Sequence, residues 1–485
     1  MSEFYTSLDH FAILPALLMG MFGCAIFLFD FWLFPAAREK RYLVWFVIVA
    51  EVFVGIALYR QFTYLQSSGL SSVAAFNGLL SIDGFSIFFN VMFLFAGLLT
   101  AMVSYRYLEI ERENHGEYYG LLLMAQCGMF FLASATELVS LFIGVELMTI
   151  TFYVLVGFLA RNKRSNEAAI KYFILGSFSS AFLAYGFSLL YGLSGSTRLA
   201  DITSALAARP LDDPLLLIAI VTTTVGVLFK LAVAPFHMWA PDVYEGAPTP
   251  LTAFLSVAPK AAAFGMMIRF FQNHHALHVT TLLAVLAAVT MTVGNLAALR
   301  QTNVKRLLAY SSVAQMGYIL MGLVAGGAMG VHSVLIYLAA YIFMNVGVFA
   351  SVIAVGEDAK TESIDGFSGL AFRSLPLALV TTVFLLSLTG IPPLAGFIGK
   401  FSLFSAVLQT PGLVWLAVVG AINSVISLAY YFSIVRLMFF GDAKRSDPVR
   451  LATPVLACLT VASSFTLVAG VFPNLLIVLV QSVWP

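Results

Sequence analysis

The sequence predicts an all-α polytopic integral membrane protein with about 14 transmembrane helices. Of its 485 residues, 61% are hydrophobic and only 10% are charged. Soluble domains are about 45–50% apolar and about 25% charged. The apolar residues also gather into repeated runs of about 20, the length at which a helix crosses the hydrocarbon core of a bilayer. Composition and run length therefore lead to the same fold class.

The runs follow one another closely, and no polar stretch between them is long enough to form a separate soluble domain. We place the predicted spans at residues 11–34, 43–59, 79–104, 118–135, 137–160, 171–195, 214–242, 251–271, 279–299, 307–327, 331–356, 375–409, 413–440 and 451–481.

Two of these spans contain prolines that break a helix. Ala234-Pro235 interrupts the seventh span and 390–393 interrupts the twelfth, so 375–409 is expected to be one discontinuous span. The two breaks are five spans apart, which reverses the direction of crossing and is typical of inverted repeats. The predicted divisions are 1–117 (helices 1–3), 118–271 (first five-helix inverted repeat, helices 4–8), 279–440 (second inverted repeat, helices 9–13) and 451–481 (helix 14).

The basic residues indicate the orientation of the chain. With the N-terminus outside, the inward connections hold 18 Lys and Arg residues and the outward connections hold 4. Basic residues concentrate on the inner side of membrane proteins, so both termini are expected on the outer side. The first ten residues contain no Lys or Arg, which predicts that 11–34 is a retained first span rather than a cleaved signal.

Four ionisable residues inside predicted spans are the main candidates for function, whereas Asp30, Asp83 and Glu137 lie near span ends. The four are Glu146, near the middle of the fifth span, and Lys230, Lys260 and Lys400. A charge at the bilayer centre costs about 2.5–3.5 kcal/mol on insertion scales, so such groups are functional by default. The alternatives are a side chain that reaches the interface or a structural ion pair.

Each of the three lysines has a proline close by in the sequence. A proline frees the backbone carbonyl four residues earlier, and at membrane depth that carbonyl must be satisfied by protein or by internal water. His237, next to the first break, could relay protons or bond such a carbonyl. The carbonyls expected to be freed belong to Leu231, Leu255, Leu388 and Thr389.

The chain contains no motif that would supply energy or hold a redox centre. It has no phosphate-binding GxxxxGK loop and no dinucleotide-binding GxGxxG between a strand and a helix. The three cysteines are too far apart for an iron–sulfur or zinc site, so no cofactor is expected in this chain. The net charge of +1 provides no excess of positive charge that would indicate nucleic-acid binding. Any uphill transport must therefore be driven by a partner.

Several stretches resemble the antiporter-like membrane subunits of respiratory complex I, and most of all subunit N, which corresponds to subunit 2 of the mitochondrial enzyme. The resemblance covers roughly 120–440. The stretches that carry it are GVELMTITFYVLVGFLA, FKLAVAPFHMWAPDVYEGAPTPLTAFLSVAPKAAAF, QTNVKRLLAYSSVAQMGYILMG and LSLTGIPPLAGFIGKF.

This resemblance implies a proton-translocating subunit of NADH:quinone oxidoreductase in a bacterial inner membrane. Its partners would be the other membrane-arm subunits, including sister antiporter-like subunits, with flavin and iron–sulfur clusters in the hydrophilic arm. The resemblance pairs Glu146 with Lys230 and links them through Lys260 to Lys400. A lysine at 400 favours subunit N, or the terminal subunit L, over M. The chain ends soon after its last span, without the lateral helix of subunit L.

One departure from the family leaves the outward proton exit unassigned. Gln315 and the region 338–344 lack the ionisable residue that sister subunits often carry there. Ser311 and Ser312 are expected to support helix contacts, although they could also hold water molecules.

Elementary electrostatics describes how a buried carboxylate–ammonium pair can work. Burial lowers the pKa of a lysine and raises that of a glutamate, and proximity of the two groups opposes both shifts. Separating the pair would therefore release the proton of the lysine. Two rival functions stay open: a subunit of an Mrp-type cation/proton antiporter or of a related membrane hydrogenase or dehydrogenase, and a scaffold whose ion pair is structural.

Overall fold

The computed structural model describes residues 7–33, 40–207, 209–210, 212–271, 279–443, 445 and 447–484. Arg38 and Lys444, two of the basic residues used for the orientation, lie outside this part of the chain. The chain divides into two compact units. Unit 1 comprises Met1–Ala101, Glu111–Leu231 and Ala258–His278, and unit 2 comprises Met102–Ile110, Ala232–Val257 and Val279–Pro485.

Unit 1 contains the first eight α-helices and a small hairpin. The helices are α1 (Ser7–Leu28, continued by the π-helical turn Phe29–Leu33), α2 (Tyr42–Ser68), α3 (Gly84–Glu111, with 102–110 in unit 2), α4 (Gly116–Ser134), α5 (Leu138–Val156), α6 (Lys163–Ser194), α7 (Leu199–Ala207) and α8 (Pro214–Leu231).

Unit 2 contains most of the remaining helices. They are α9 (Trp239–Gly246), the first part of α10 (Thr249–Phe271), α11 (Val279–Ala298), α12 (Val304–Ala325), α13 (Gly327–Ala359), α14 (Leu370–Arg373), α15 (Leu375–Thr389), α16 (Ala395–Leu408), α17 (Val414–Phe440), α18 (Thr453–Val471) and α19 (Pro473–Val483).

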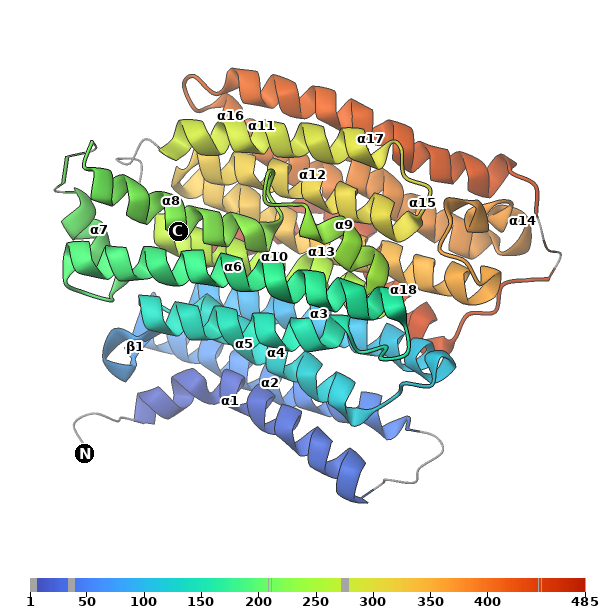
Figure 1. Ribbon diagram of the computed structural model, residues 1–485, viewed down its shortest axis with the longest axis horizontal. Helices are drawn as coiled ribbons and strands as arrows, with labels where there is room; N and C mark the ends of the chain where they lie inside the picture. The colour runs from blue at the N-terminus through green and yellow to red at the C-terminus, as the bar shows by residue number, and fades with distance from the viewer. Residues whose placement is uncertain are drawn as a thin grey trace. The chain divides into compact units, whose positions relative to one another are not determined.

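Small residues allow close helix packing in unit 1. Helices α6 and α8 run side by side (Figure 1), and Ser179 Oγ of α6 donates a hydrogen bond of 3.0 Å to the carbonyl of Gly226 in α8. A Cβ added to Gly226 would lie 2.8 Å from the Cβ of Leu183. Helix association in membranes depends on such close backbone approach. This contact fixes α6 and α8, which both contribute to the site below.

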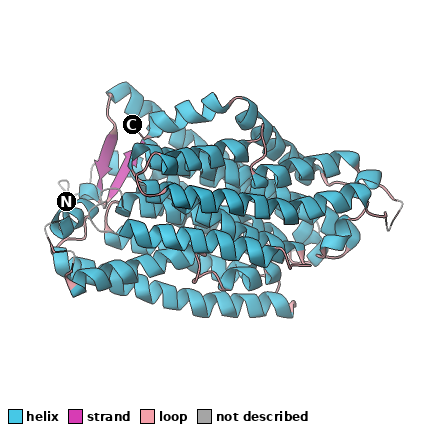
Figure 2. Cartoon of the chain, turned by 90° about the horizontal axis from the view of Figure 1, so that it is seen from above, coloured by secondary structure: helices cyan, strands magenta, loops and turns pink. Residues whose placement is uncertain are grey.

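A β-hairpin precedes α3, and it was not predicted from the sequence. Strands β1 (Ser72–Ala75) and β2 (Leu80–Asp83) pair antiparallel, with Val73 opposite Ile82 (Figure 2). Arg269 Nη2 donates to both carboxylate oxygens of Asp83, at 2.9 and 3.0 Å. The predicted start of the third span at 79 was therefore wrong, because Leu79 lies in the turn of the hairpin, strand β2 follows, and the helix begins at Gly84.

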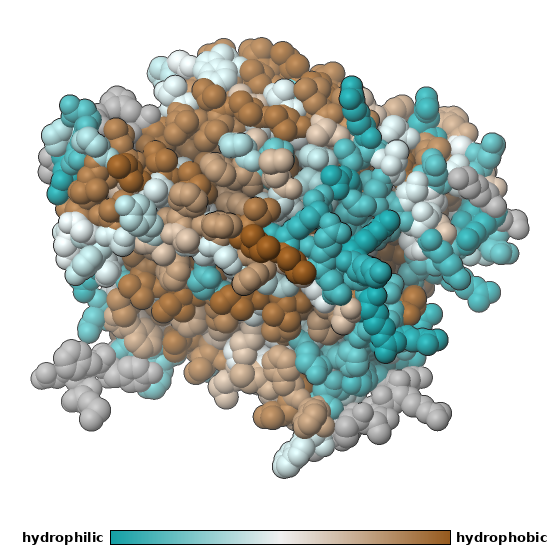
Figure 3. Space-filling model, viewed as in Figure 1, coloured by the Kyte–Doolittle hydropathy of each residue, from teal (hydrophilic) through white to brown (hydrophobic). Residues whose placement is uncertain are grey.

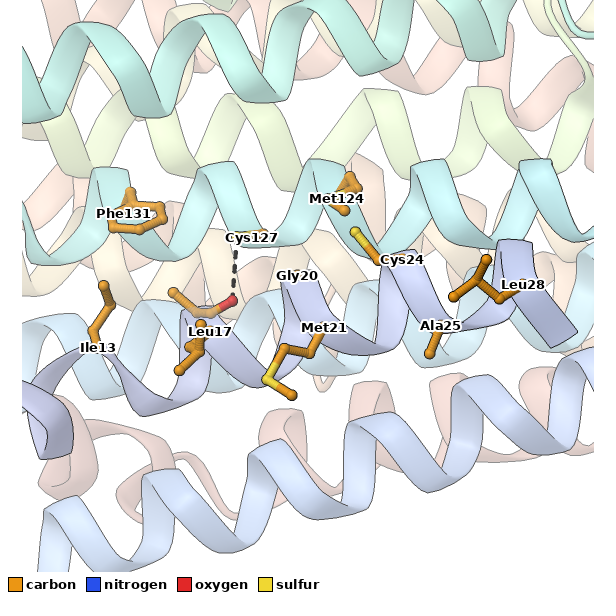
Figure 4. A pocket seen from close by; sticks show the side chains of 11 residues that line it. Ile13, Leu17, Gly20, Met21, Cys24, Ala25, Leu28, Met124, Cys127 and Phe131 are labelled. Atoms are coloured by element: carbon orange, nitrogen blue, oxygen red, sulfur yellow. Dashed lines mark hydrogen bonds between the residues drawn. The ribbon is translucent and has the colours of Figure 1, made fainter.

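Helices α1 and α4 border an apolar groove with a volume of about 480 Å³ (Figure 4). Its polar contact is internal, since Cys127 Sγ donates to the carbonyl of Ala16 at 3.2 Å. Leu17 and Met21, which line the groove, are exposed. The side chains around the groove are those expected of a surface in contact with hydrocarbon.

Twelve helices in the described part of the chain are long and apolar enough to cross a membrane. Figure 3 shows hydrophobic residues over much of the visible face, with hydrophilic residues gathered toward the beginning of α6. The polytopic α-helical class is thereby confirmed, and the count of fourteen stays a prediction. The last predicted span, 451–481, is two helices rather than one, because Pro473 ends the run of α18 and begins α19.

Both expected helix breaks are present. Helix α8 ends at Leu231 and α9 begins at Trp239. Helix α15 ends at Thr389, where Gly390 adopts a left-handed conformation with φ 95°, and α16 begins at Ala395. The break at 390–393 was predicted correctly from its glycine and prolines.

The return of α16 onto α15 requires a glycine at position 396. A Cβ added there would lie 1.9 Å from the carbonyl oxygen of Ser387. We expect Gly396→Ala to destabilise the protein by about 1–3 kcal/mol, the usual cost of overpacking. Gly192→Ala is the control, because its Cβ would meet nothing within 4 Å on the exposed surface of α6. Thermal unfolding of the purified proteins measures both, and equal melting temperatures for the two variants would contradict the close contact.

Candidate functional site

Lys230 lies in the last turn of α8, buried among hydroxyl groups of unit 1. Its side chain is 7% exposed. The ammonium Nζ donates to Thr149 Oγ1 of α5 at 3.1 Å and to Ser180 Oγ of α6 at 3.4 Å. Hydroxyls both accept and donate, so they can stabilise the ammonium and also pass a proton on. Three helices thus converge on one buried cation.

Glu146 is the charged neighbour of Lys230. It lies three residues before Thr149 on α5, on the same face of the helix, and its charge interacts with the ammonium of Lys230. Within the described residues the two side chains do not form a direct ion pair, and the ammonium is bonded to the hydroxyls of α5 and α6. Glu146 Oε1 is buried without a hydrogen-bond partner, so it retains the capacity to accept a proton.

Lys260 is the third candidate in unit 1. It lies on α10 directly after Pro259, which is inside the helix, and its side chain is 1% exposed. Such deep burial rules out the alternative in which the side chain reaches the membrane interface.

His237 lies in the break between α8 and α9, in unit 2. Its ring is partly buried, and Nδ1 has no hydrogen-bond partner among the described residues. The same break is held in place by a hydrogen bond to α11, in which the backbone N–H of Ala234 donates to Thr290 Oγ1 at 3.0 Å. A ring nitrogen without a partner can accept or donate a hydrogen bond, according to the tautomer of the imidazole.

Lys400, on α16 of unit 2, bonds the backbone that the second break exposes. Its Nζ donates to the carbonyl of Thr389 at 2.9 Å and to Ser424 Oγ of α17 at 3.0 Å. The ammonium also lies 4.3 Å from the centre of the Tyr318 ring, a cation–π contact. The expected pairing of a buried lysine with a freed carbonyl is confirmed here.

A network of hydroxyl and amide groups satisfies the other freed carbonyl at this break. Gln315 Nε2 donates to Leu388 O at 3.0 Å, and Gln315 Oε1 accepts a hydrogen bond from the hydroxyl of Tyr337. Gln315 Nε2 also donates to Tyr431 OH at 3.4 Å, and this hydroxyl is bonded to Ser311. In the sequence, Gln315 stood out only as a missing ionisable residue, and the tyrosines were not singled out.

Ser312 belongs to a second hydroxyl pair of unit 2. Its Oγ lies 2.7 Å from Tyr341 OH, and both groups are buried. Tyr337 and Tyr341 are four residues apart on α13, so their side chains lie on the same face of the helix. That spacing, together with adjacent serines on α12, is the signal from which the network could have been found.

Asp30, His115 and Glu117 form the group of potential metal ligands in the described chain. Asp30 Oδ2 already accepts hydrogen bonds from Lys40 Nζ at 2.8 Å and from the backbone of Gly116 at 2.6 Å. A carboxylate neutralised by an ammonium is a poor fit to a cation site, so the cluster is better described as an ion pair.

Comparison with known proteins shows to which family the chain belongs. The family described as NADH:quinone oxidoreductase/Mrp antiporter, TM, matches residues 135–427. NADH-quinone oxidoreductase subunit N 2 of Solibacter usitatus is 49% identical over 99% of this chain and 98% of its own. The chain belongs to the subunit N family of NADH-quinone oxidoreductases. The matched region contains Glu146, Lys230, Lys260 and Lys400.

Chains of known structure share this fold. A chain of respiratory complex I from Thermus thermophilus aligns with a TM-score of 0.77 and 30% identity, covering 96% of this chain and 98% of that chain. A chain of the Mrp complex from Dietzia aligns with a TM-score of 0.84 at 22% identity, covering 97% of each. The second likeness shows a shared fold alone. The resemblance to subunit N is confirmed.

The hydroxyl of Thr149 is expected to stabilise the buried ammonium of Lys230. Replacing it in Thr149→Val keeps the shape and removes the acceptor, which costs about 1.5–3 kcal/mol for a hydrogen bond to a charged group. Thr151→Val is the control on the same helix, since within the described residues the Thr151 hydroxyl bonds backbone carbonyls alone, at 2.7 and 2.9 Å. Thermal unfolding of the purified variants should show the larger loss for position 149, and an equal loss would contradict this role.

Proposed function

We propose that the chain translocates protons across the membrane as the antiporter-like subunit of NADH:quinone oxidoreductase, with Glu146, Lys230, Lys260 and Lys400 as proton-carrying groups. The observation that carries this proposal is the contact of Lys400 with Thr389 O at the broken helix. A broken helix that presents backbone carbonyls and a buried ionisable group inside the membrane is typical of a transport site.

In unit 1 the proton-carrying pair is Glu146 and Lys230. The negative charge of Glu146 opposes the cost of burying the ammonium of Lys230. Movement of the carboxylate away from the ammonium leaves a buried cation that releases its proton. The hydroxyls of Thr149 and Ser180 already accept from the ammonium and offer the first step of that release.

Lys260 would receive and pass on this proton within unit 1. It is an amine buried in α10, and burial disfavours its charged form, so it exchanges a proton more readily than an exposed lysine. The imidazole of His237 would assist at the break through Nδ1, which has no hydrogen-bond partner among the described residues.

In unit 2 the corresponding group is Lys400. Thr389 O and Ser424 Oγ stabilise its ammonium, and in the described part of the chain no carboxylate makes a hydrogen bond to it. The hydroxyls of Tyr337 and Tyr431, joined through Gln315, supply further donors and acceptors along α12, α13 and α17. We propose this network as part of the proton path for which the sequence offered no ionisable residue.

The energy for this transport would come from partner subunits. Moving one charge against 100 mV costs about 2.3 kcal/mol, which buried side chains alone cannot supply in a cycle. We propose that electron transfer from NADH to quinone in the redox arm, through flavin and iron–sulfur clusters, drives the other membrane-arm subunits and this chain together. We further propose a bacterial inner membrane location, with both termini outside and two inverted repeats.

The Mrp-type antiporter is the second candidate, because a chain of the Dietzia Mrp complex shares the fold. The high identity to subunit N proteins favours the redox complex. Purification of the native assembly distinguishes the two: co-purifying flavin and iron–sulfur subunits support the first function, and a set of small membrane subunits alone supports the second.

Removal of the pair in unit 1 should abolish coupled activity without preventing assembly. We expect Lys230→Ala and Glu146→Gln each to lower proton pumping by at least about tenfold. With one charge missing, the pair can no longer alternate between binding and releasing a proton. The matched controls are Lys171→Ala and Glu167→Gln, which break an exposed pair with a 2.8 Å contact on α6.

Pumping is measured in vesicles with the purified complex, and assembly is checked on native gels. Normal pumping in an assembled Lys230→Ala complex would remove this residue from the mechanism. Failure of both variants to assemble would instead support the structural role of the pair.

Substitution at position 400 separates proton transfer from charge balance. Lys400→Arg should impair pumping although it keeps the charge, since arginine, with a pKa above about 12, does not release a proton. Lys400→Glu should be less harmful, because a carboxylate in this site can still titrate. Proton uptake per NADH in vesicles is the measurement, and a fully coupled arginine variant would contradict the role of Lys400.

A further inference from the structure

A second buried ionisable site lies in unit 1, apart from the residues of the proposed proton path. Glu51 of α2 and Gln126 of α4 are 5% and 0% exposed. Gln126 Nε2 donates a hydrogen bond of 2.9 Å to Glu51 Oε1. The contact joins residues 75 positions apart in the sequence, and neither has a role in the function proposed above.

The other oxygen atoms of Glu51 and Gln126 bear on whether Glu51 is protonated. Glu51 Oε2 and Gln126 Oε1 are both buried without a hydrogen-bond partner in the described structure. An ionised carboxylate and an amide carbonyl can only accept, so they cannot satisfy each other. Within the described residues no basic side chain forms an ion pair with Glu51 either, and an isolated buried charge is very costly.

A single proton on Glu51 would give both oxygens a hydrogen-bond partner. A carboxylic acid donates from one oxygen and accepts at the other, and a primary amide does the same through its NH₂ and carbonyl groups. Gln126 Nε2 already donates to Glu51 Oε1, so a proton on Glu51 Oε2 would add the donor that Gln126 Oε1 lacks. Two neutral groups would then share two complementary hydrogen bonds.

We propose that Glu51 and Gln126 form a proton-binding site, in which Glu51 holds one proton as a neutral carboxylic acid at neutral pH. Proton binding forms the O–H bond at Oε2 and involves no other covalent change. The site is distinct from the proposed proton path and does not depend on it.

The backbone of α3 is shaped around this pair. A Cβ added to Gly97 would lie 1.8 Å from Gln126 Nε2 and 2.8 Å from Glu51 Oε1. A glycine at this position therefore lets α3 cover the pair directly. The cover excludes lipid and bulk water from the hydrogen bonds, which strengthens them and makes an unpaired charge more costly.

Glu51→Gln is the decisive variant, because glutamine copies the neutral acid. Its NH₂ group can donate to Gln126 Oε1 where the protonated carboxyl would, and its carbonyl can accept from Gln126 Nε2. We therefore expect an unchanged melting temperature for Glu51→Gln. Gln126→Leu, which leaves the acid without either bond, should lower it clearly.

Infrared spectroscopy of the full chain in its native assembly reports the proton directly. The spectrum of the unaltered protein minus that of Glu51→Gln should show one carbonyl band of a protonated carboxyl group, shifted in deuterated water. Glu137→Gln is the control, because Glu137 caps α5 by accepting from the backbone N–H groups of Val139 and Ser140 and should contribute carboxylate bands instead.

Three results would overturn the proposal. The first is a difference spectrum for Glu51→Gln that contains carboxylate bands and no carboxyl band. The second is a marked rise in melting temperature on this substitution, which would indicate removal of a buried charge. The third is failure of the Glu51→Gln chain to fold, since a neutral isosteric side chain should be tolerated.

Discussion

A backbone carbonyl that loses its helical partner inside a membrane must find another donor, because hydrocarbon offers none. The break between α15 and α16 frees two such carbonyls, and the protein satisfies both: Gln315 donates to Leu388 O, and Lys400 donates to Thr389 O. The cost of burying an ammonium is thus offset by the same break that disrupts the helix. This mutual dependence explains why a lysine and two prolines occur together in an apolar sequence.

The parts of the site that the sequence could predict are those with a strong local signal. Both helix breaks were predicted from their prolines. Lys230, Lys260 and Lys400 were predicted as site residues because each is a charged residue in an apolar run. Their partners could not be predicted, because they come from helices distant in the sequence and have ordinary residue types. Thr149 and Ser180 look like the many hydroxyl residues of membrane helices that bond only their own backbone, as Ser177 does on α6.

The fold shows the same division between local and distant signals. The apolar runs predicted the helices because hydrocarbon selects for length and composition. The hairpin at 72–83 was missed because its strands are only four residues each and its anchor, Arg269, lies far away in the sequence. The hydroxyl network around Gln315 was missed because tyrosines in an apolar helix look like packing residues until their hydroxyls are placed.

If the lysines at the broken helices carry protons, they must change their protonation state during each transport cycle. The most direct measurement is solid-state ¹⁵N NMR of the complex with labelled lysine side chains, compared at rest and during NADH oxidation. Lys230→Arg and Lys400→Arg variants assign the signals. We expect the Nζ signals of these two residues to shift between ammonium and neutral amine positions. Signals that stay at the ammonium position throughout turnover would contradict a role in proton transfer.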